Sequence, residues 1–229
     1  MLLLITEYLS QYIHGFRVFQ YLTFRSIIAA LTALAISLLL SPKLIKLFRA
    51  KQLGQPIRED GPAMHKVKSG IPTMGGGLIL LAVFISMLLW ADWRVFYVWV
   101  VVFVTLAFGC IGGLDDYAKI KHANSKGLSA RVKYFFQSVI ALIALLALYH
   151  HAVLPQQTQL VIPFFKHIGL QLGVMYIVLG YFVIVGSSNA VNLTDGLDGL
   201  ALLPTVMVAA ALGLFAYLEG NDYFSHYLA

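Results

Sequence analysis

The sequence predicts an all-α polytopic membrane protein. Hydrophobic residues make up 60% of its 229 residues and charged residues only 11%, and the mean hydropathy is +0.83. The apolar residues come in blocks of about 20, the length that an α-helix needs to cross the hydrocarbon core of a bilayer. The blocks lack the alternating pattern of membrane β-barrel strands, so we expect helices.

Six such blocks follow one another within a single membrane domain that covers residues 1–229. The predicted spans are residues 22–40, 75–90, 95–114, 134–149, 172–188 and 200–218. The first is expected to end at Ser41 and Pro42, because proline interrupts the hydrogen bonds of a helix. Residues 1–21 predict a short helix that lies on the outer interface, and TQLVIPFF before the fifth span predicts a small hairpin.

The basic residues indicate the orientation of these helices. The formal net charge is +6, and twelve of the sixteen Lys and Arg residues fall in two connections, residues 43–68 and 119–133. Because these connections flank apolar spans, their charge argues for membrane topology and against nucleic acid binding. By the positive-inside rule both connections are cytoplasmic, which places the N-terminus and the C-terminus of a six-span chain outside.

The stretch GSSNAVNLTDGLDGL, residues 186–200, places two amides and two carboxylates between apolar spans. These side chains belong to Asn189, Asn192, Asp195 and Asp198. Removing polar groups from water costs free energy, so their crowding between membrane helices indicates a function.

A second acidic feature, Asp115 with Asp116, ends the third span. Adjacent residues diverge by about 100° on a helix, so we expect that the two carboxylates cannot both face one partner. Only together with a third group could they enclose a cation. Acids at a helix C-terminus are also disfavoured by the macrodipole, which favours a ligand as the explanation. The alternative is a solvated acidic helix end that Lys119 and Lys121 balance.

The first basic connection ends in DGPAMHKVKSGIPTMGGG, which is rich in turn-forming residues. Thr73 can cap the helix of the second span, and the glycines 75–77 follow it. Free N–H groups at a helix start bind anions, and Lys66 and Lys68 lie nearby in sequence. Alternatively the lysines only set the topology and the glycines only allow close helix packing.

The predicted topology brings all of these polar features to the cytoplasmic face. Carboxylate and amide oxygens suit Mg²⁺, and lysines hold phosphate oxygens. We therefore expect phosphoryl transfer between a water-soluble nucleotide and a lipid phosphate. An ion-coupled membrane transporter is the alternative from another class, a structural subunit comes third, and NLTDGLDG lacks the spacing of a Ca²⁺ loop.

Four motifs in this order resemble the polyprenyl-phosphate N-acetylhexosamine-1-phosphate transferases: HKVKSGIPTMGG, GGLDDYAK, KGLSARVKYFFQ and NAVNLTDGLDGLA. The resemblance extends over the whole chain. It implies Mg²⁺-dependent transfer of phospho-MurNAc-pentapeptide from UDP-MurNAc-pentapeptide to undecaprenyl phosphate, which gives lipid I and UMP in peptidoglycan synthesis. Transfer of another UDP-amino sugar is the alternative. The resemblance also implies the bacterial inner membrane, with the active site on the cytoplasmic face, and dimers are common among such folds.

The resemblance also implies roles for individual residues. The expected catalytic residues are Asp115, Asp116, Lys133 and His65. The expected substrate-binding residues are Lys68, Thr73, Asn189, Asn192, Asp195 and Asp198. Asp115 and Asp116 are also the expected metal ligands, with a further Asp beyond Ala229. The family fold has about ten membrane helices. We therefore expect that the natural protein continues past Ala229 and that the 229-residue chain alone is incomplete and inactive.

Overall fold

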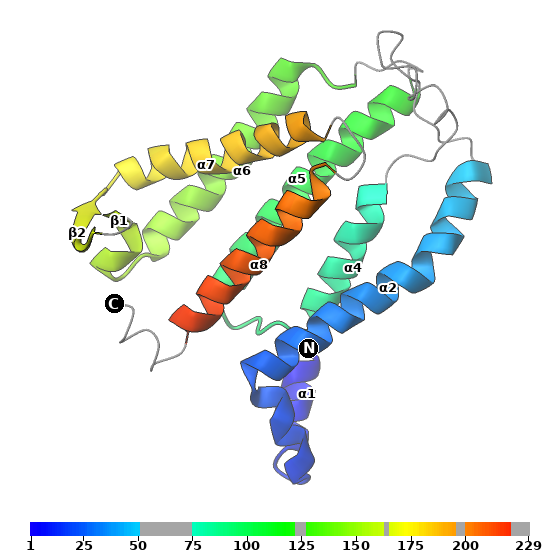
Figure 1. The fold of residues 1–229 in the computed structure, drawn as a ribbon, viewed down its shortest axis with the longest axis vertical. Coiled ribbons are helices and arrows are strands. Elements are labelled where there is room, and N and C mark those ends of the chain that lie inside the picture. The colour runs from blue at the N-terminus through cyan, green and yellow to red at the C-terminus, as the bar shows by residue number, and fades with distance from the viewer. Residues whose placement is uncertain (51–74, 122–126, 163–164, 196–199, 221–229) are drawn as a thin grey trace. The chain divides into compact units, whose positions relative to one another are not determined.

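The computed structural model describes residues 1–50, 75–121, 127–162, 165–195 and 200–220. These residues form helices and one two-stranded hairpin (Figure 1). Five helices in the described part are long and apolar enough to cross a membrane. They are Leu22–Phe48 within α2 (Leu22–Ala50), α5 (Phe96–Lys121), α6 (Ala130–His151), α7 (Met175–Thr194) and α8 (Leu202–Glu219). The prediction of an all-α polytopic membrane protein is confirmed.

The remaining predicted span corresponds to α4 (Gly75–Trp90), an apolar helix of 16 described residues. It is shorter than the five helices that reach membrane-spanning length. The count of six spans therefore stays a prediction, as does the location of both termini outside.

Three of the long helices continue past the ends that hydropathy marks. The predicted span 22–40 lies within α2, which runs through Pro42 to Ala50, so the helix does not end at Ser41 and Pro42. A proline removes one backbone hydrogen bond, and the helix continues beyond it while changing direction in its C-terminal half (Figure 1). Likewise α5 continues to Lys121 and α7 to Thr194.

The N-terminal segment forms two short helices where the sequence predicts one. These are α1 (Leu2–Leu9) and the 3₁₀ helix η1 (His14–Gln20). Between them the Ser10 hydroxyl donates to the Glu7 carbonyl at 2.7 Å and accepts from Gln20 Nε2 at 3.1 Å. These bonds hold η1 back against the end of α1 instead of extending one helix.

The chain divides into two compact units, Met1–Ile140 and Ala141–Ala229, with the boundary inside α6. In the first unit α4 packs against α2 and α5. Ser86 of α4 is buried and donates to the Ala29 carbonyl of α2 at 2.6 Å, which is a hydrogen bond between two apolar helices. Trp90 Nε1 donates to Thr32 Oγ1 of the same pair of helices at 3.0 Å. Such polar contacts supplement packing where lipid removes the hydrophobic driving force between helices.

The second unit holds the end of α6, a 3₁₀ turn η2 (Pro155–Thr158), the hairpin, α7 and α8. Strands β1 (Gln159–Ile162) and β2 (Phe165–Gln171) pair antiparallel, with Gln159 opposite Gln171. The prediction of a hairpin here is confirmed. Gly180 of α7 faces Leu145 of α6 so closely that a Cβ atom at Gly180 would overlap the leucine side chain.

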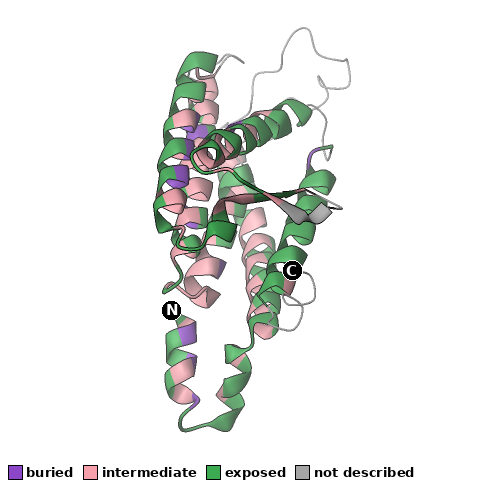
Figure 2. Ribbon diagram, turned by 90° about the vertical axis from the view of Figure 1, so that its left-hand side faces the viewer, coloured by how far each residue is buried: buried purple, intermediate pink, exposed green. Residues whose placement is uncertain are grey.

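Exposure along the helices fits a chain whose outer surface meets lipid. In Figure 2 few described residues are buried, and most of the ribbon is exposed or intermediate. The buried apolar residues are mostly small, such as Ala82, Ala141 and Ala144. Small residues allow helix backbones to approach each other, while the larger apolar side chains face outward.

Candidate active site

The last turns of α5 bring two acids and one lysine together. Lys119 Nζ lies 2.8 Å from Asp115 Oδ2 and 3.1 Å from Asp116 Oδ1. The expectation that the two carboxylates cannot both face one partner is wrong. Lys119 follows them by four and three residues, which places its long side chain between their directions on the helix. One ammonium group therefore neutralises part of the charge of both acids.

The turn before α6 contacts the carboxylate of Asp115. Leu128 N–H donates to Asp115 Oδ1 at 2.8 Å. Gly127 precedes it with φ of 60°, a backbone conformation that glycine adopts readily. A Cβ atom at Gly127 would lie 2.5 Å from Asp115 Oδ1 and 2.9 Å from the Cε atom of Lys119. Glycine is therefore required for the close approach of this turn to α5.

Helix α6 begins directly after this turn. The hydroxyl of Ser129 accepts the N–H of Val132 at 3.4 Å, in the manner of an N-cap. Lys133 lies in the first turn of α6, five residues after Leu128, whose N–H contacts Asp115. The turn therefore places a second cation at the start of the helix that is held against Asp115.

Sequence reasoning missed Gly127, Leu128 and Ser129 as part of this site. The signal was present in KGLSAR, where a glycine precedes a serine at a helix start. It could have predicted the turn and the cap. The bond from Leu128 to Asp115 uses a backbone group, which side-chain chemistry alone does not indicate.

The predicted polar motif near residue 190 lies on the last turns of α7. Asn189 and Asn192 are helical, and Asp195 caps the helix with its N–H bonded to the Val191 carbonyl at 3.0 Å. These three residues recur every third position, so they share one side of the helix end. Asn189 Nδ2 donates to the Val185 carbonyl at 2.8 Å, and such bonds to a preceding turn satisfy polar side chains within the helix.

Four predicted site residues lie outside the described residues. They are His65, Lys68, Thr73 and Asp198. Asp115, Asp116 and Lys133 belong to the first unit, and the α7 residues belong to the second. The expectation that all of them line one cleft therefore stays a prediction.

The described residues do not by themselves form a site for Mg²⁺. In the described ranges no group of three or more His, Cys, Asp or Glu side chains gathers as metal ligands would. The ammonium of Lys119 also lies where a cation between Asp115 and Asp116 would bind. A Mg²⁺ ion would therefore need ligands beyond these described side chains.

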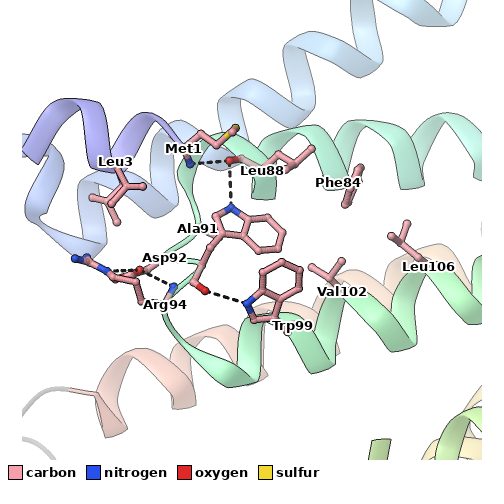
Figure 3. A pocket seen from close by; sticks show the side chains of 12 residues that line it. Met1, Leu3, Phe84, Leu88, Ala91, Asp92, Arg94, Trp99, Val102 and Leu106 are labelled. Atoms are coloured by element: carbon pink, nitrogen blue, oxygen red, sulfur yellow. Dashed lines mark hydrogen bonds and ion pairs between the residues drawn. The ribbon is translucent and has the colours of Figure 1, made fainter. Parts of the chain in front are cut away.

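An apolar cavity of about 550 Å³ lies near the other end of α5 (Figure 3). Residues from α1, α4 and α5 line it, among them Leu3, Phe84, Leu88, Trp99, Val102 and Leu106. Its charged side chains, Asp92 and Arg94, pair with each other at 2.8 Å. This lining offers little to a phosphate, so the cavity is not the candidate active site.

A comparison with known families gives the class of the protein. A model of glycosyl transferase family 4 matches residues 98–229, more than half of the chain. The chain belongs to glycosyl transferase family 4. Membership in glycosyl transferase family 4 supports a glycosyl-1-phosphate transferase, which moves a phospho-sugar to a polyprenyl phosphate. The five long apolar helices agree with a multi-pass membrane enzyme of this class.

The match to glycosyl transferase family 4 contains most of the site that the structure describes. It includes the acids of α5, the turn at Gly127, Lys133 and the polar end of α7. It begins after the connection that holds His65, Lys68 and Thr73.

Proposed function

We propose that the protein is a phospho-N-acetylmuramoyl-pentapeptide-transferase. It transfers phospho-MurNAc-pentapeptide from UDP-MurNAc-pentapeptide to undecaprenyl phosphate and releases lipid I and UMP. The observation that supports this most is the acidic pair of α5 with Lys119 between its carboxylates, within the part of the chain that matches glycosyl transferase family 4. The four sequence motifs favour this member of the family.

The reaction is a phosphoryl transfer between two anions. A phosphate oxygen of undecaprenyl phosphate attacks the phosphorus that carries the sugar, and the bond from that phosphorus to the oxygen bridging to UMP breaks. UMP leaves with the bonding electron pair. Catalysis of such transfers depends on positioning and on neutralising charge.

The residues of this chain supply both requirements. A carboxylate of the acidic pair takes the proton of the lipid phosphate or orients that phosphate. His65 is the further proposed catalytic residue. Lys133 and Lys68 neutralise the diphosphate. The residues that hold the nucleotide and sugar are Thr73, Asn189, Asn192, Asp195 and Asp198.

Mg²⁺ is the proposed cofactor, because the resemblance to the polyprenyl-phosphate N-acetylhexosamine-1-phosphate transferases implies it. A Mg²⁺ ion held by Asp115 or Asp116 would displace the Lys119 ammonium from that carboxylate. Substrate phosphates and a further Asp would complete its ligands, since Mg²⁺ commonly uses one or two carboxylates plus phosphate oxygens. Chelation of divalent ions is expected to stop UMP release, and added Mg²⁺ is expected to restore it. Full UMP release in excess EDTA would remove Mg²⁺ from the proposal.

The proposed location is the bacterial inner membrane, with six spans in this chain and the acidic pair at the cytoplasmic face. The basic connections at residues 43–68 and 119–133 support this orientation. A homodimer is the proposed assembly. Cysteine labelling from either side of right-side-out vesicles tests the orientation, and a residue of the 119–133 connection that labels only from outside would overturn it.

The decisive assay follows UMP release and lipid I formation by the complete protein in vesicles that contain undecaprenyl phosphate. Asp116→Asn and Asp195→Asn are expected to reduce turnover strongly, and unchanged turnover in both would reject the site. Product formation with another UDP-amino sugar in place of UDP-MurNAc-pentapeptide would favour the related transferase. Ion flux without any transfer would favour a transporter.

A further inference from the structure

We propose that the apolar cavity between α1, α4 and α5 binds one acyl chain of a membrane phospholipid whose headgroup has no net charge. The cavity has a volume of about 550 Å³ and lies near the start of α5, whereas Asp115 and Asp116 lie near its end (Figure 3). All of its lining residues belong to the first compact unit. The proposal does not depend on the proposed transferase reaction.

The walls of the cavity come from three segments that are far apart in the sequence. Leu3 and Leu4 belong to α1, Phe84 and Leu88 to α4, and Trp99, Val102 and Leu106 to α5. The volume falls in the range of about 300–1,000 Å³ in which proteins bind small molecules. Side chains around an empty cavity lose dispersion contacts, and water does not fill a cavity that lacks polar partners. In a membrane protein the bilayer supplies the apolar chains that fill such a space.

The cavity extends from the level of the membrane–water interface into the hydrocarbon. Trp93 and Trp99 line one end of it, and tryptophan is typical of that interface. Leu106 lies seven residues after Trp99 on α5, which is about 10 Å along the helix axis. Phe84 lies four residues before Leu88 on α4, which is about 6 Å. The lining therefore follows a lipid chain over several methylene groups.

The polar groups in the walls already have partners. Trp93 Nε1 donates to the Leu88 carbonyl at 3.2 Å, and Trp99 Nε1 donates to the Trp93 carbonyl at 2.9 Å. The two indole rings meet edge to face, with their centroids 4.8 Å apart. The Met1 ammonium donates to the same Leu88 carbonyl at 2.9 Å (Figure 3). Because these donors are satisfied within the walls, the cavity offers packing contacts to its occupant, which suits a hydrocarbon chain.

The charges beside the cavity indicate the kind of headgroup. Arg94 contacts Asp92 Oδ1 and Glu7 Oε1, each at 2.8 Å, and its side chain is 59% exposed. Arg94 and the Met1 ammonium carry two positive charges, and Asp92 and Glu7 carry two negative charges. This group has no excess charge to attract an anionic headgroup. A headgroup that contains both a phosphate and an ammonium, as in phosphatidylethanolamine, matches its mixed charges.

Photolabelling of the complete protein in bilayer nanodiscs tests the proposal. The probe is a phosphatidylethanolamine that carries a diazirine in one acyl chain, and mass spectrometry of peptides identifies the residues that it labels. Labelling is expected on Phe84, Val102 and Leu106, which line the cavity. Label only on residues outside the lining, or no label at all, would overturn the proposal.

A variant that fills the cavity is expected to exclude the probe. Val102→Phe is expected to lower labelling of the lining residues by about tenfold, because the phenyl ring takes up space that the chain needs. Val101→Phe is the matched control, since Val101 is 54% exposed and outside the lining, whereas Val102 is 8% exposed. It is expected to leave the labelling unchanged. If Val102→Phe does not fold, Leu106→Phe makes the same test from the next turn of α5.

Three further outcomes would overturn the proposal. Equal labelling in the filled variant and in Val101→Phe would show that the probe lies outside the cavity. Loss of the label in excess undecaprenyl phosphate would assign the cavity to the chain of that lipid. Stronger labelling by a phosphatidylglycerol probe with the same diazirine chain would reject a headgroup without net charge.

Discussion

Lys119 Nζ lies 2.8 Å from Asp115 Oδ2, one turn further along the same helix. The side chains are 18% and 14% exposed, so solvent screens this pair less than a surface ion pair. Asp116 shares the same ammonium at 3.1 Å. Removing the lysine charge would therefore leave two neighbouring carboxylates without a described cation that contacts them.

We expect Lys119→Gln to lower transferase turnover by about 10- to 100-fold, the effect of losing a charge-assisted hydrogen bond. Lys121→Gln is the matched control, because Lys121 is exposed near the same helix end and has no ion pair among the described residues. Steady-state measurement of UMP release compares them. Equal losses in the two variants would show that only the general positive charge of this connection matters.

The turn at Gly127 predicts a second effect. Gly127→Ala is expected to lower the thermal stability and the turnover of the protein, because alanine is strained at φ of 60° and its Cβ would lie 2.5 Å from Asp115 Oδ1. Gly173→Ala provides the control, since Gly173 also has a positive φ, of 49°, but open space around it. The strain in each variant is about 1–2 kcal/mol. A melting temperature that falls equally in both would show that contact with Asp115 adds nothing.

The contact between α4 and α5 depends on Gly109. A Cβ atom there would overlap the Leu80 side chain, whereas nothing lies within 4 Å of a Cβ atom at Gly112 on the same helix. Gly109→Leu is therefore expected to destabilise the protein by about 1–3 kcal/mol through overpacking, and Gly112→Leu much less. Thermal unfolding in detergent measures both. Equal melting temperatures would mean that α4 and α5 do not pack closely in solution.

Arg94 links α1 to the connection between α4 and α5, where it contacts Glu7 and Asp92. Its hydrogen bond to the Asp92 carboxylate holds the pKa of Asp92 below its usual range. A pKa that is lower in the folded chain stabilises the fold above the unfolded value of about 3.9, and this contribution is lost as the pH falls through the folded pKa. We expect Arg94→Gln to lower the melting temperature slightly at pH 7 and not at strongly acidic pH.

Arg17→Gln serves as the control for Arg94→Gln, because Arg17 is exposed and has no ion pair in the ranges that the structure describes. It is expected to leave the melting temperature unchanged at every pH. A difference between Arg94→Gln and wild type that grows as the pH falls would contradict the sign of the Asp92 effect.

The helices could be predicted from the sequence, because an apolar block of membrane length satisfies its backbone hydrogen bonds in lipid only as a helix or within a closed barrel. Their ends could not. Hydropathy marks the part of a helix that lies in lipid, and polar residues such as Asp116 and Asn192 can continue the same helix into water. The sequence predicts an end at Pro42, but α2 continues past it, because one missing hydrogen bond does not stop a long helix.

The sequence predicts which acids belong to the candidate site and that Lys133 belongs to it. It predicts less of how these side chains are arranged. The shared contact of Lys119 depends on a flexible side chain that reaches between two carboxylates. The contact between Asp115 and Leu128 depends on a left-handed glycine that lets a backbone N–H reach α5. Neither follows from spacing along one helix. The roles of His65 and Lys68 stay predictions, because these residues lie outside the described ranges.

The bond from Asp115 to Leu128 also bears on how much length variation this region tolerates. It joins two residues that are thirteen positions apart in the sequence, so it holds the start of α6 against the end of α5. The entropy lost on closing a loop rises only with the logarithm of its length, by about 0.6 kcal/mol for each doubling. Lengthening the connection between α5 and α6 is therefore expected to cost this contact little free energy, so that α6 can still start against Asp115.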